Sequence, residues 1–212
     1  ALFQKLARQG IFRYAVPREF GGIRRRVQVR DLCVIRETLA SMSPLADVLF
    51  AVQALAIYPL ITAGTLAQQV AYLPRLTTGQ HMGAFALTEP NAGSDAAATQ
   101  LRARKQGDNY VLNGVKSFIS NAGLAHLYVV FGSTHPARRG NGISAFVVEA
   151  GTPGLAVRER LALISPHPIG TVAFEGCCVP TTQLLGNPGK GLGIALDTLG
   201  VLRCSVGAAA VG

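Results

Sequence analysis

One twelve-residue stretch near the middle of the chain combines an apolar run with small polar side chains, Ala84–Asp95 (AFALTEPNAGSD). Thr88 and Ser94 each contribute a hydroxyl group. Between them, Pro90 removes a backbone donor and Gly93 can adopt a positive φ. Such a loop can hydrogen-bond a flat ligand with polar edges while the apolar run supports it. A strand that exits into a loop without any ligand explains the same residues, and this chemistry alone does not decide between the two interpretations.

The wider sequence resembles the acyl-CoA dehydrogenase family over nearly all of its 212 residues. The run ALTEPNAGSD resembles the flavin-binding signature of that family. Five more segments match the family in order: AVPREFGG (Ala15–Gly22), YLPRLTTGQ (Tyr72–Gln80), NGVKSFIS (Asn113–Ser120), GISAFVVEAGTPGL (Gly142–Leu155) and VPTTQLLGNPGKGLGIAL (Val179–Leu196). Six ordered segments make a much more specific match than one motif.

The resemblance implies that the chain binds FAD, and it assigns flavin contacts to seven residues: Phe85, Leu87, Thr88, Gly93, Ser94, Phe118 and Ser120. Gly93 and Ser94 would serve the flavin pyrophosphate or the pantetheine arm of a bound acyl-CoA, so Ser94 is also a predicted substrate contact. Phe118 and Ser120 stand where the family usually has Trp and Thr, and they keep an aromatic ring and a hydroxyl. Taken alone, Phe118 would be interpreted as a core aromatic residue.

Two positions depart from the family pattern. The family commonly has an Asp three residues before an Arg that helps to hold the acyl-CoA. Arg203 is that arginine here and a predicted substrate contact, but Gly200 occupies the Asp position. The segment Ser165–Gly170 also differs from the usual Arg- and Ser-bearing loop. His167 lies there between two prolines, and we interpret it as a loop histidine.

None of the 11 acidic residues matches the catalytic glutamate of the family. That residue would belong to a helical bundle beyond Gly212, so we assign no catalytic residue within this chain. Glu89, next to a proline, suits a structural hydrogen bond. Asp95, which precedes three alanines, suits a turn or a helix cap.

Composition excludes several classes of function. The net charge is +9, but the runs Arg24–Arg26 and Arg138–Arg139 lack the interleaved aromatics of nucleic-acid-binding proteins. We expect most of these arginines to form a solvated face, some of them attracting the phosphates of coenzyme A. The most apolar window, Leu45–Ile61, contains Asp, Gln and Pro, and we interpret it as a buried helix of a cytoplasmic protein, not a membrane span.

The four cysteines do not have the spacing of a zinc site, and no metal site is predicted. Adjacent Cys177 and Cys178 would point to opposite faces of a strand, which disfavours a disulfide between them. We expect reduced, buried thiols at these positions and at Cys33 and Cys204.

The elements that must position these residues change type near residue 80. Apolar spacing predicts a helix over Val27–Met42 and an interior helix over Leu45–Tyr58, bent or ended by Pro59. A third helix is predicted over Thr65–Leu73, ending at Pro74. Later, a helix is predicted from Leu192 through Arg203 toward Gly212.

Between these helical parts, short runs bounded by glycine and asparagine predict strands. The predicted strands are Ala84–Leu87, Gln100–Lys105, Tyr110–Asn113, Val115–Ile119, Leu127–Phe131, Ile143–Val148 and Thr171–Phe174. Short strands at this spacing favour an antiparallel barrel or sandwich. The predicted fold is therefore of the α+β class, with a helical N-terminal domain (residues 1–80), an antiparallel β-barrel middle domain (81–186) and the start of a C-terminal helical bundle (187–212). Because Ala208–Val211 has no terminating signal, we expect a fragment or one half of a split enzyme.

The resemblance implies FAD-dependent α,β-dehydrogenation of an acyl-CoA thioester, with electrons passed to an electron-transferring flavoprotein. A homo-oligomer (dimer or tetramer) or a complementing C-terminal chain would complete the site. Two alternatives stay open. Acyl-CoA oxidases and flavin monooxygenases share these motifs, and a degenerate or split subunit would bind flavin or a partner without turnover.

Overall fold

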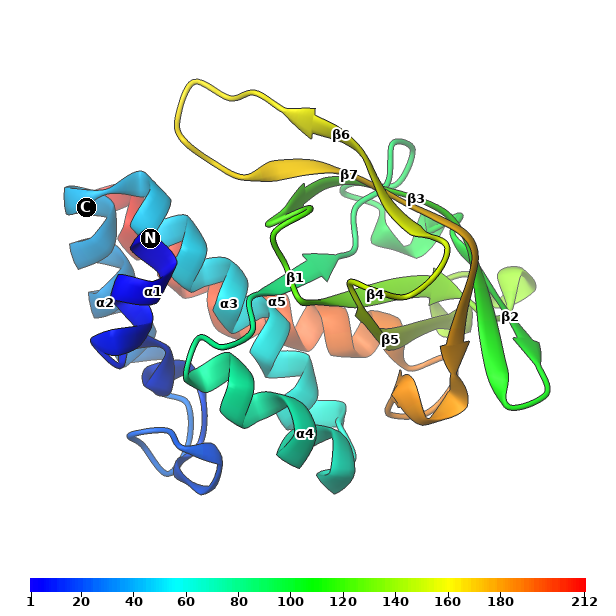
Figure 1. The fold of residues 1–212 in the computed structure, drawn as a ribbon, viewed down its shortest axis with the longest axis horizontal. Coiled ribbons are helices and arrows are strands. Elements are labelled where there is room, and N and C mark those ends of the chain that lie inside the picture. Colours follow the sequence, from blue (N-terminus) through cyan, green and yellow to red (C-terminus); the bar gives the residue numbers. More distant parts are fainter.

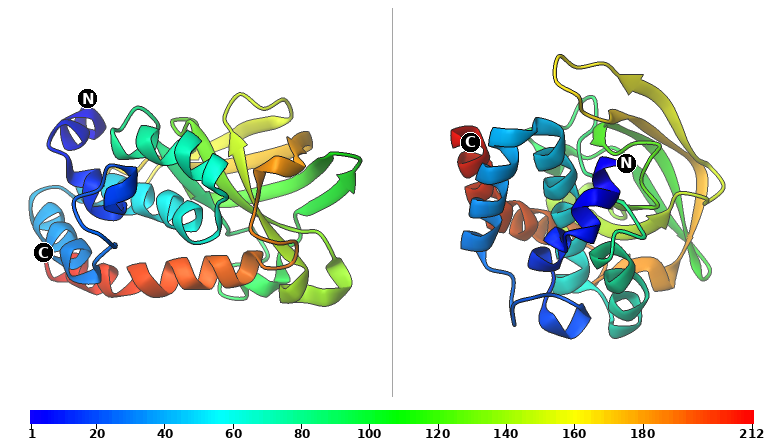
Figure 2. Two further views of the ribbon diagram at one scale, coloured as in Figure 1. Left: turned by 90° about the horizontal axis from the view of Figure 1, so that it is seen from below. Right: turned by 60° about the vertical axis from the view of Figure 1, so that its left-hand side comes forward.

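A layer of helices packs beside a twisted sheet in the computed structural model, which describes all 212 residues (Figure 1). The helices are α1 (Leu2–Arg8), α2 (Val29–Met42), α3 (Pro44–Ala63), α4 (Leu66–Thr77) and α5 (Gly191–Val211). The last helix starts at the sheet and runs along one side of the molecule to the far end of the helical layer (Figure 2). Both chain termini therefore lie at the helical end (Figure 1).

Side-chain caps mark the starts of α3 and α4, and prolines do not end these helices. The Ser43 side chain accepts a hydrogen bond from the Ala46 backbone at the start of α3, and Thr65 forms a capping box with Gln68 at the start of α4. Pro59 and Pro74 lie inside α3 and α4, so the predicted ends at Tyr58 and Leu73 are wrong.

Eight strands form one mixed sheet. They are β1 (Gly83–Ala86), β2 (Arg102–Gln106), β3 (Asn109–Ser120), β4 (Leu127–Ser133), β5 (Ile143–Glu149), β6 (Leu155–Leu161), β7 (Ile169–Pro180) and β8 (Leu184–Leu185). The order is β6-β7-β3-β2-β4-β5-β8, with β1 paired to β4 off this path. The predicted antiparallel barrel is wrong in two respects. The sheet does not close, and β4 pairs in parallel with both β1 and β2.

Strand β3 is continuous where the sequence predicted two strands with a turn at Asn113 and Gly114. Gly114 has a φ of 149°, and a Cβ atom there would lie 2.8 Å from the Leu101 Cα atom. Glycine thus lets the strand pass close to its neighbour without turning away. The pairing of β3 with β7 shifts register here and again between Lys116 and Ile119. The sequence did not predict β6 or β8.

Two hydrophobic cores fill the molecule. The larger lies between the helices and one face of the sheet, and it combines helical residues such as Phe50 and Leu73 with Val129 and Phe131 of β4. The smaller lies within the curved sheet, around Tyr128 and Phe146. Because one core spans both layers, helices and sheet form a single packed unit.

A buried ion pair joins three helices. Arg36 of α2 donates from Nε and Nη2 to the two carboxylate oxygens of Asp47 in α3, each at 2.7 Å. Its Nη1 donates to the Ser205 hydroxyl of α5 at 3.1 Å. Arg36 is buried, which is unusual for a charged side chain. This pair anchors α5, whose exposed face carries apolar residues.

Two helices, α3 and α5, are long and apolar enough to cross a bilayer by length and composition alone. Most of the apolar window of α3 is buried inside the protein, as in the core helix of a globular fold. The buried Arg36–Asp47 pair also gives α3 a polar partner within the fold. The predicted burial of this helix is confirmed.

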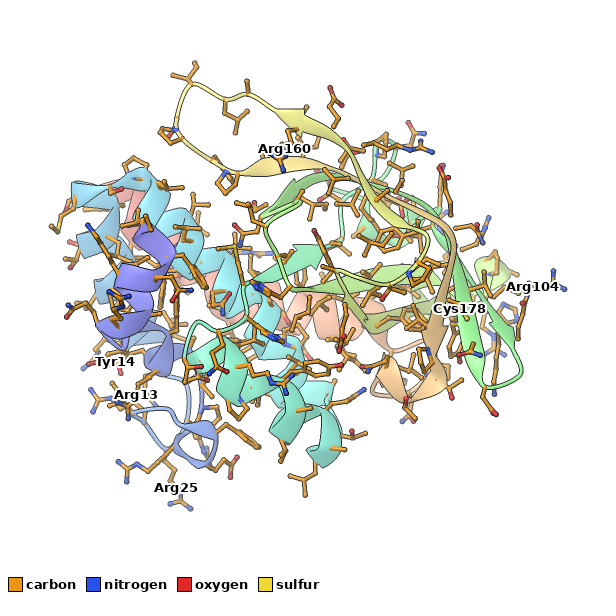
Figure 3. All side chains as sticks on the ribbon, in the orientation of Figure 1. Arg13, Tyr14, Arg25, Arg104, Arg160 and Cys178 are labelled. Atoms are coloured by element: carbon orange, nitrogen blue, oxygen red, sulfur yellow. The ribbon has the colours of Figure 1, made fainter.

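The surface charge and the thiols follow the sequence in part. Figure 3 shows Arg25 beside the N-terminal loops and Arg104 at the opposite end of the molecule, so these exposed arginines do not share one patch.

All four cysteines are free. Cys177 is buried and Cys178 exposed, which confirms their opposite faces, but the expected burial of Cys178 and Cys204 is wrong.

Candidate functional site

The candidate flavin residues lie along a seam where β1 and the segment after it run beside the second half of β3. The Ser117 amide donates to the Thr88 carbonyl at 2.9 Å, and the Asn121 side-chain amide donates to the Gly83 carbonyl at 2.9 Å. These two contacts fix both ends of the seam. Residues 85–88 are thereby brought alongside residues 117–121.

A buried ion pair holds the signature loop against β3. The Lys116 ammonium donates to Glu89 Oε1 at 2.7 Å and to the Leu87 carbonyl at 2.8 Å. The same carboxylate accepts from the backbone amides of Gln100 at 2.6 Å and Leu101 at 3.0 Å. The structural hydrogen-bond role predicted for Glu89 is confirmed.

Sequence reasoning missed Lys116, because a lysine in a strand ordinarily faces solvent. Its side chain is fully buried. Burial lowers the pKa of Lys116 to about 8, while the charge of Glu89 and the hydrogen bond to it oppose that shift. A buried charge needs such a partner, and here the partner belongs to the signature loop.

Phe118 is not the core residue that its type alone suggests. It has a φ of 56°, a conformation that side-chain-bearing residues rarely adopt, and it lies in the register shift between Lys116 and Ile119. Its side chain is 61% exposed. Backbone strain of this kind clusters at ligand sites, and Phe118 directly follows Ser117, whose amide bonds the Thr88 carbonyl.

Ser120, at the end of β3, is held by a residue from another loop. Its hydroxyl lies 2.7 Å from Nε2 of His167, in the segment between β6 and β7. Burial lowers the pKa of His167, which favours the neutral imidazole. The interpretation of His167 as only a loop histidine is therefore incomplete, because its side chain bonds a candidate flavin residue.

Phe85 and Leu87 lie at the floor of the seam. Both are half-buried and pack against the core between helices and sheet. The Phe85 ring contacts Phe131 of β4 at a centroid distance of 4.9 Å. These side chains are apolar and anchored in the core, and their role as support for a flat ligand stays a prediction.

Gly93 and Ser94 lie farther out, in an exposed loop. Reciprocal backbone hydrogen bonds between Glu89 and Ala92 close the turn before them. Asp95 is the N-cap residue of the short 3₁₀ helix Ala96–Ala98, but its side chain makes no capping hydrogen bond. It instead forms an exposed ion pair with Arg139 at 3.3 Å.

Arg203 lies apart from the seam, on α5. It borders a pocket of about 210 Å³ between α2, α3 and α5. The lining is mainly apolar and consists of Arg36, Ala51, Leu55, Leu199, Leu202, Arg203 and Val206. The structure thus separates the predicted substrate arginine from the flavin residues and places it beside an apolar slot.

The chain matches two family descriptions, "Acyl-CoA dehydrogenase, N-terminal domain" over residues 1–80 and "Acyl-CoA dehydrogenase, middle domain" over residues 84–177. Among curated proteins, an acryloyl-CoA reductase (NADH) of Anaerotignum propionicum is 42% identical, over 99% of this chain and 54% of the relative. The chain therefore spans about half the length of the curated relatives it matches.

Solved structures share the whole fold. Butyryl-CoA dehydrogenase from Megasphaera elsdenii matches with a TM-score of 0.93 and 34% identity, over 98% of this chain and 56% of that one. A chain from the work on the electron transferring flavoprotein of Acidaminococcus fermentans gives 0.93 and 35%, over 98% and 55%. An acyl-CoA dehydrogenase complexed with FAD, from Bacillus anthracis, gives 0.88 and 30%, over 98% and 36%.

Proposed function

This chain belongs to the acyl-CoA dehydrogenase family, and we propose that it supplies the flavin-binding part of an FAD-dependent α,β-dehydrogenation of an acyl-CoA thioester. The observation that carries the proposal is the seam, where the signature loop and the strained end of β3 meet. Likeness to a structure complexed with FAD supports the cofactor. Bound FAD would accept the hydride that leaves the β-carbon of the substrate.

The residues of this chain would bind and orient the cofactor. Phe85 and Leu87 support it from below, Phe118 offers an exposed ring face, and the hydroxyls of Thr88 and Ser120 lie along the same seam. The Lys116–Glu89 pair fixes the loop that carries Thr88. Ser94 and Gly93, in the exposed loop, would meet the pyrophosphate or the pantetheine arm.

We propose that Arg203 contacts the acyl-CoA away from the reacting bond. The acyl chain must lie against the flavin for its β-hydrogen to leave as hydride, whereas Arg203 lies on α5, apart from the seam. Its exposed guanidinium would attract an anionic part of coenzyme A. This assignment is tested by Arg203→Gln, which should raise KM for acyl-CoA substrates without changing FAD affinity.

The relatives support two candidates for the direction of the reaction and one for its electron acceptor. Likeness to a chain from work on an electron transferring flavoprotein supports such a flavoprotein as electron acceptor. The 42%-identical relative is named as a reductase of acryloyl-CoA, so reduction of an enoyl-CoA is the second candidate. Assays in both directions on the full-length protein separate them. Assembly as a homo-oligomer, the three domain boundaries and a cytoplasmic location stay predictions.

The flavin assignment is tested with the double variant Thr88→Val, Ser94→Ala in the full-length protein. Loss of two hydrogen bonds to a ligand should weaken FAD binding by about tenfold or more. Fluorescence titration of the FAD-free protein measures this, and Ser41→Ala on the exposed face of α2 is the control. Unchanged affinity and an unchanged flavin spectrum in the double variant would refute the site.

A further inference from the structure

The segment between β6 and β7 brings His167 to the candidate flavin seam from outside the signature. β3 and β7 pair with Ser120 opposite Ile169, so this segment starts beside the end of β3. The Asn121 amide donates to the Pro168 carbonyl at 2.6 Å, which ties the loop to the strand. His167 thus reaches Ser120 from a backbone fixed at its C-terminal side.

The two prolines around His167 restrict its position further. Pro166 and Pro168 have fixed φ angles and no amide hydrogen, and a residue that precedes proline is confined to extended conformations. The backbone of His167 therefore has few alternative conformations. Its Nε2 atom lies 2.7 Å from the Ser120 hydroxyl oxygen, within the range of a strong hydrogen bond.

The surroundings favour a neutral ring. His167 borders a cavity of about 210 Å³ in which Arg160 of β6 is the one charged side chain. Figure 3 shows Arg160 at the base of the β6–β7 arm. A neutral imidazole carries one donor and one acceptor nitrogen. Nε2 can therefore accept from the Ser120 hydroxyl or donate to it, and either bond leaves part of the hydrogen-bonding capacity of that oxygen free.

We infer that His167 is a positioning residue for the flavin: it holds the Ser120 hydroxyl in one rotamer so that its remaining hydrogen-bonding capacity faces the ligand. The inference rests on the proposed function. Serine has three staggered rotamers of similar energy, so an unheld hydroxyl must be ordered when the ligand binds. His167 supplies that order beforehand, at a position where this sequence departs from its family.

The test is a double-mutant cycle on FAD affinity in the full-length protein, with Ser120→Ala, His167→Ala and both together. We expect His167→Ala alone to weaken FAD binding by about threefold to tenfold. In the Ser120→Ala background the same change should have no further effect, since His167 acts through that hydroxyl. The absorption spectrum of the bound flavin is a second readout, and His135→Ala, on an exposed loop, is the matched control.

Recovery of FAD affinity in a conservative variant separates a positioning role of His167 from a purely structural one. Glutamine has both a donor and an acceptor, so His167→Gln should recover most of the affinity, and it serves as the comparison if the alanine variant unfolds. Unchanged FAD affinity in His167→Ala, or an equal loss with and without Ser120, overturns the inference while the proposed function stands. A wild-type protein that binds no FAD would instead overturn the proposed function itself.

Discussion

Two buried ion pairs hold this molecule together, and they use different chemistry. Lys116–Glu89 and Arg36–Asp47 both have a nitrogen–oxygen distance of 2.7 Å. The first pair is the more deeply buried, with side chains at most 3% exposed against 10% in the second. An ammonium is a point donor that can lose its charge, whereas a guanidinium is a planar fork that binds a carboxylate through two parallel bonds.

The contrast between the two ion pairs indicates which of them should respond to pH. The Arg36 pair joins helices through a bidentate contact and a serine hydroxyl. The Lys116 pair joins the signature loop to β3 and also binds a backbone carbonyl of that loop. An ammonium group with a lowered pKa therefore contacts the loop of the candidate flavin site, and a bidentate guanidinium pair lies among the helices.

The largest effect is expected from Lys116→Met. It leaves the Glu89 carboxylate buried without its cation, which should lower the free energy of unfolding by about 3–5 kcal/mol. Urea denaturation measures the loss. In the double variant Lys116→Met, Glu89→Gln no charge is buried, so part of the stability should return, although Gln offers one acceptor oxygen to the two backbone amides that bond Glu89. A single variant as stable as the wild type would show that the pair contributes nothing.

A second prediction concerns pH. The folded-state pKa of Lys116, about 8, lies below the ordinary lysine value of 10.5, so above pH 8 the unfolded chain binds more protons at this position. The free energy of unfolding should therefore rise with pH between about 8 and 10.5, by at most about 1.4 kcal/mol per pH unit. The comparison protein is the double variant Lys116→Met, Glu89→Gln, measured at each pH. A stability difference that stays flat or falls over this window would contradict the lowered pKa.

The smallest effect should come from Ser205→Ala, which removes the third partner of Arg36. Loss of one hydrogen bond to a charged group should cost about 1–2 kcal/mol, because Asp47 still pairs with the guanidinium. Unlike the Lys116 effect, this loss should not change between pH 7 and 10. Ser41→Ala, an exposed serine of α2, is the control and should stay within about 0.5 kcal/mol of the wild type.

Helices α2 to α5 were predictable because apolar spacing is a local signal. Most strand positions were predictable for a similar reason, but β6, β8 and the open, mixed pairing of the sheet were not. Glycine turns indicate where strands end, whereas the parallel pairing of β1 with β4 depends on residues more than forty positions apart. Gly114 shows the same limit, since its role depends on the nearby backbone of Leu101 and not on its own neighbours in sequence.

The candidate site also combines residues that the sequence indicated with residues that only the structure shows. The signature residues from Phe85 to Ser94 came from a resemblance, and the structure adds what places them. In the predicted strand Val115–Ile119, Lys116 occupies a position that side-chain alternation assigns to the solvent face. Only its contact with Glu89 shows its role. His167 lies 47 positions from Ser120, a distance that no local pattern spans.

A single amide side chain has a mechanical consequence for the whole protein. Gln53 of α3 donates to the carbonyls of Leu76 and His81, at 2.8 and 2.9 Å, and accepts from the Gly83 amide at 2.9 Å. These three bonds clamp both ends of the linker between α4 and β1, so the linker cannot flex as a hinge. We expect the helical layer and the sheet to move as one rigid body, and access for a large ligand to depend on the exposed loops at residues 91–95 and 162–166.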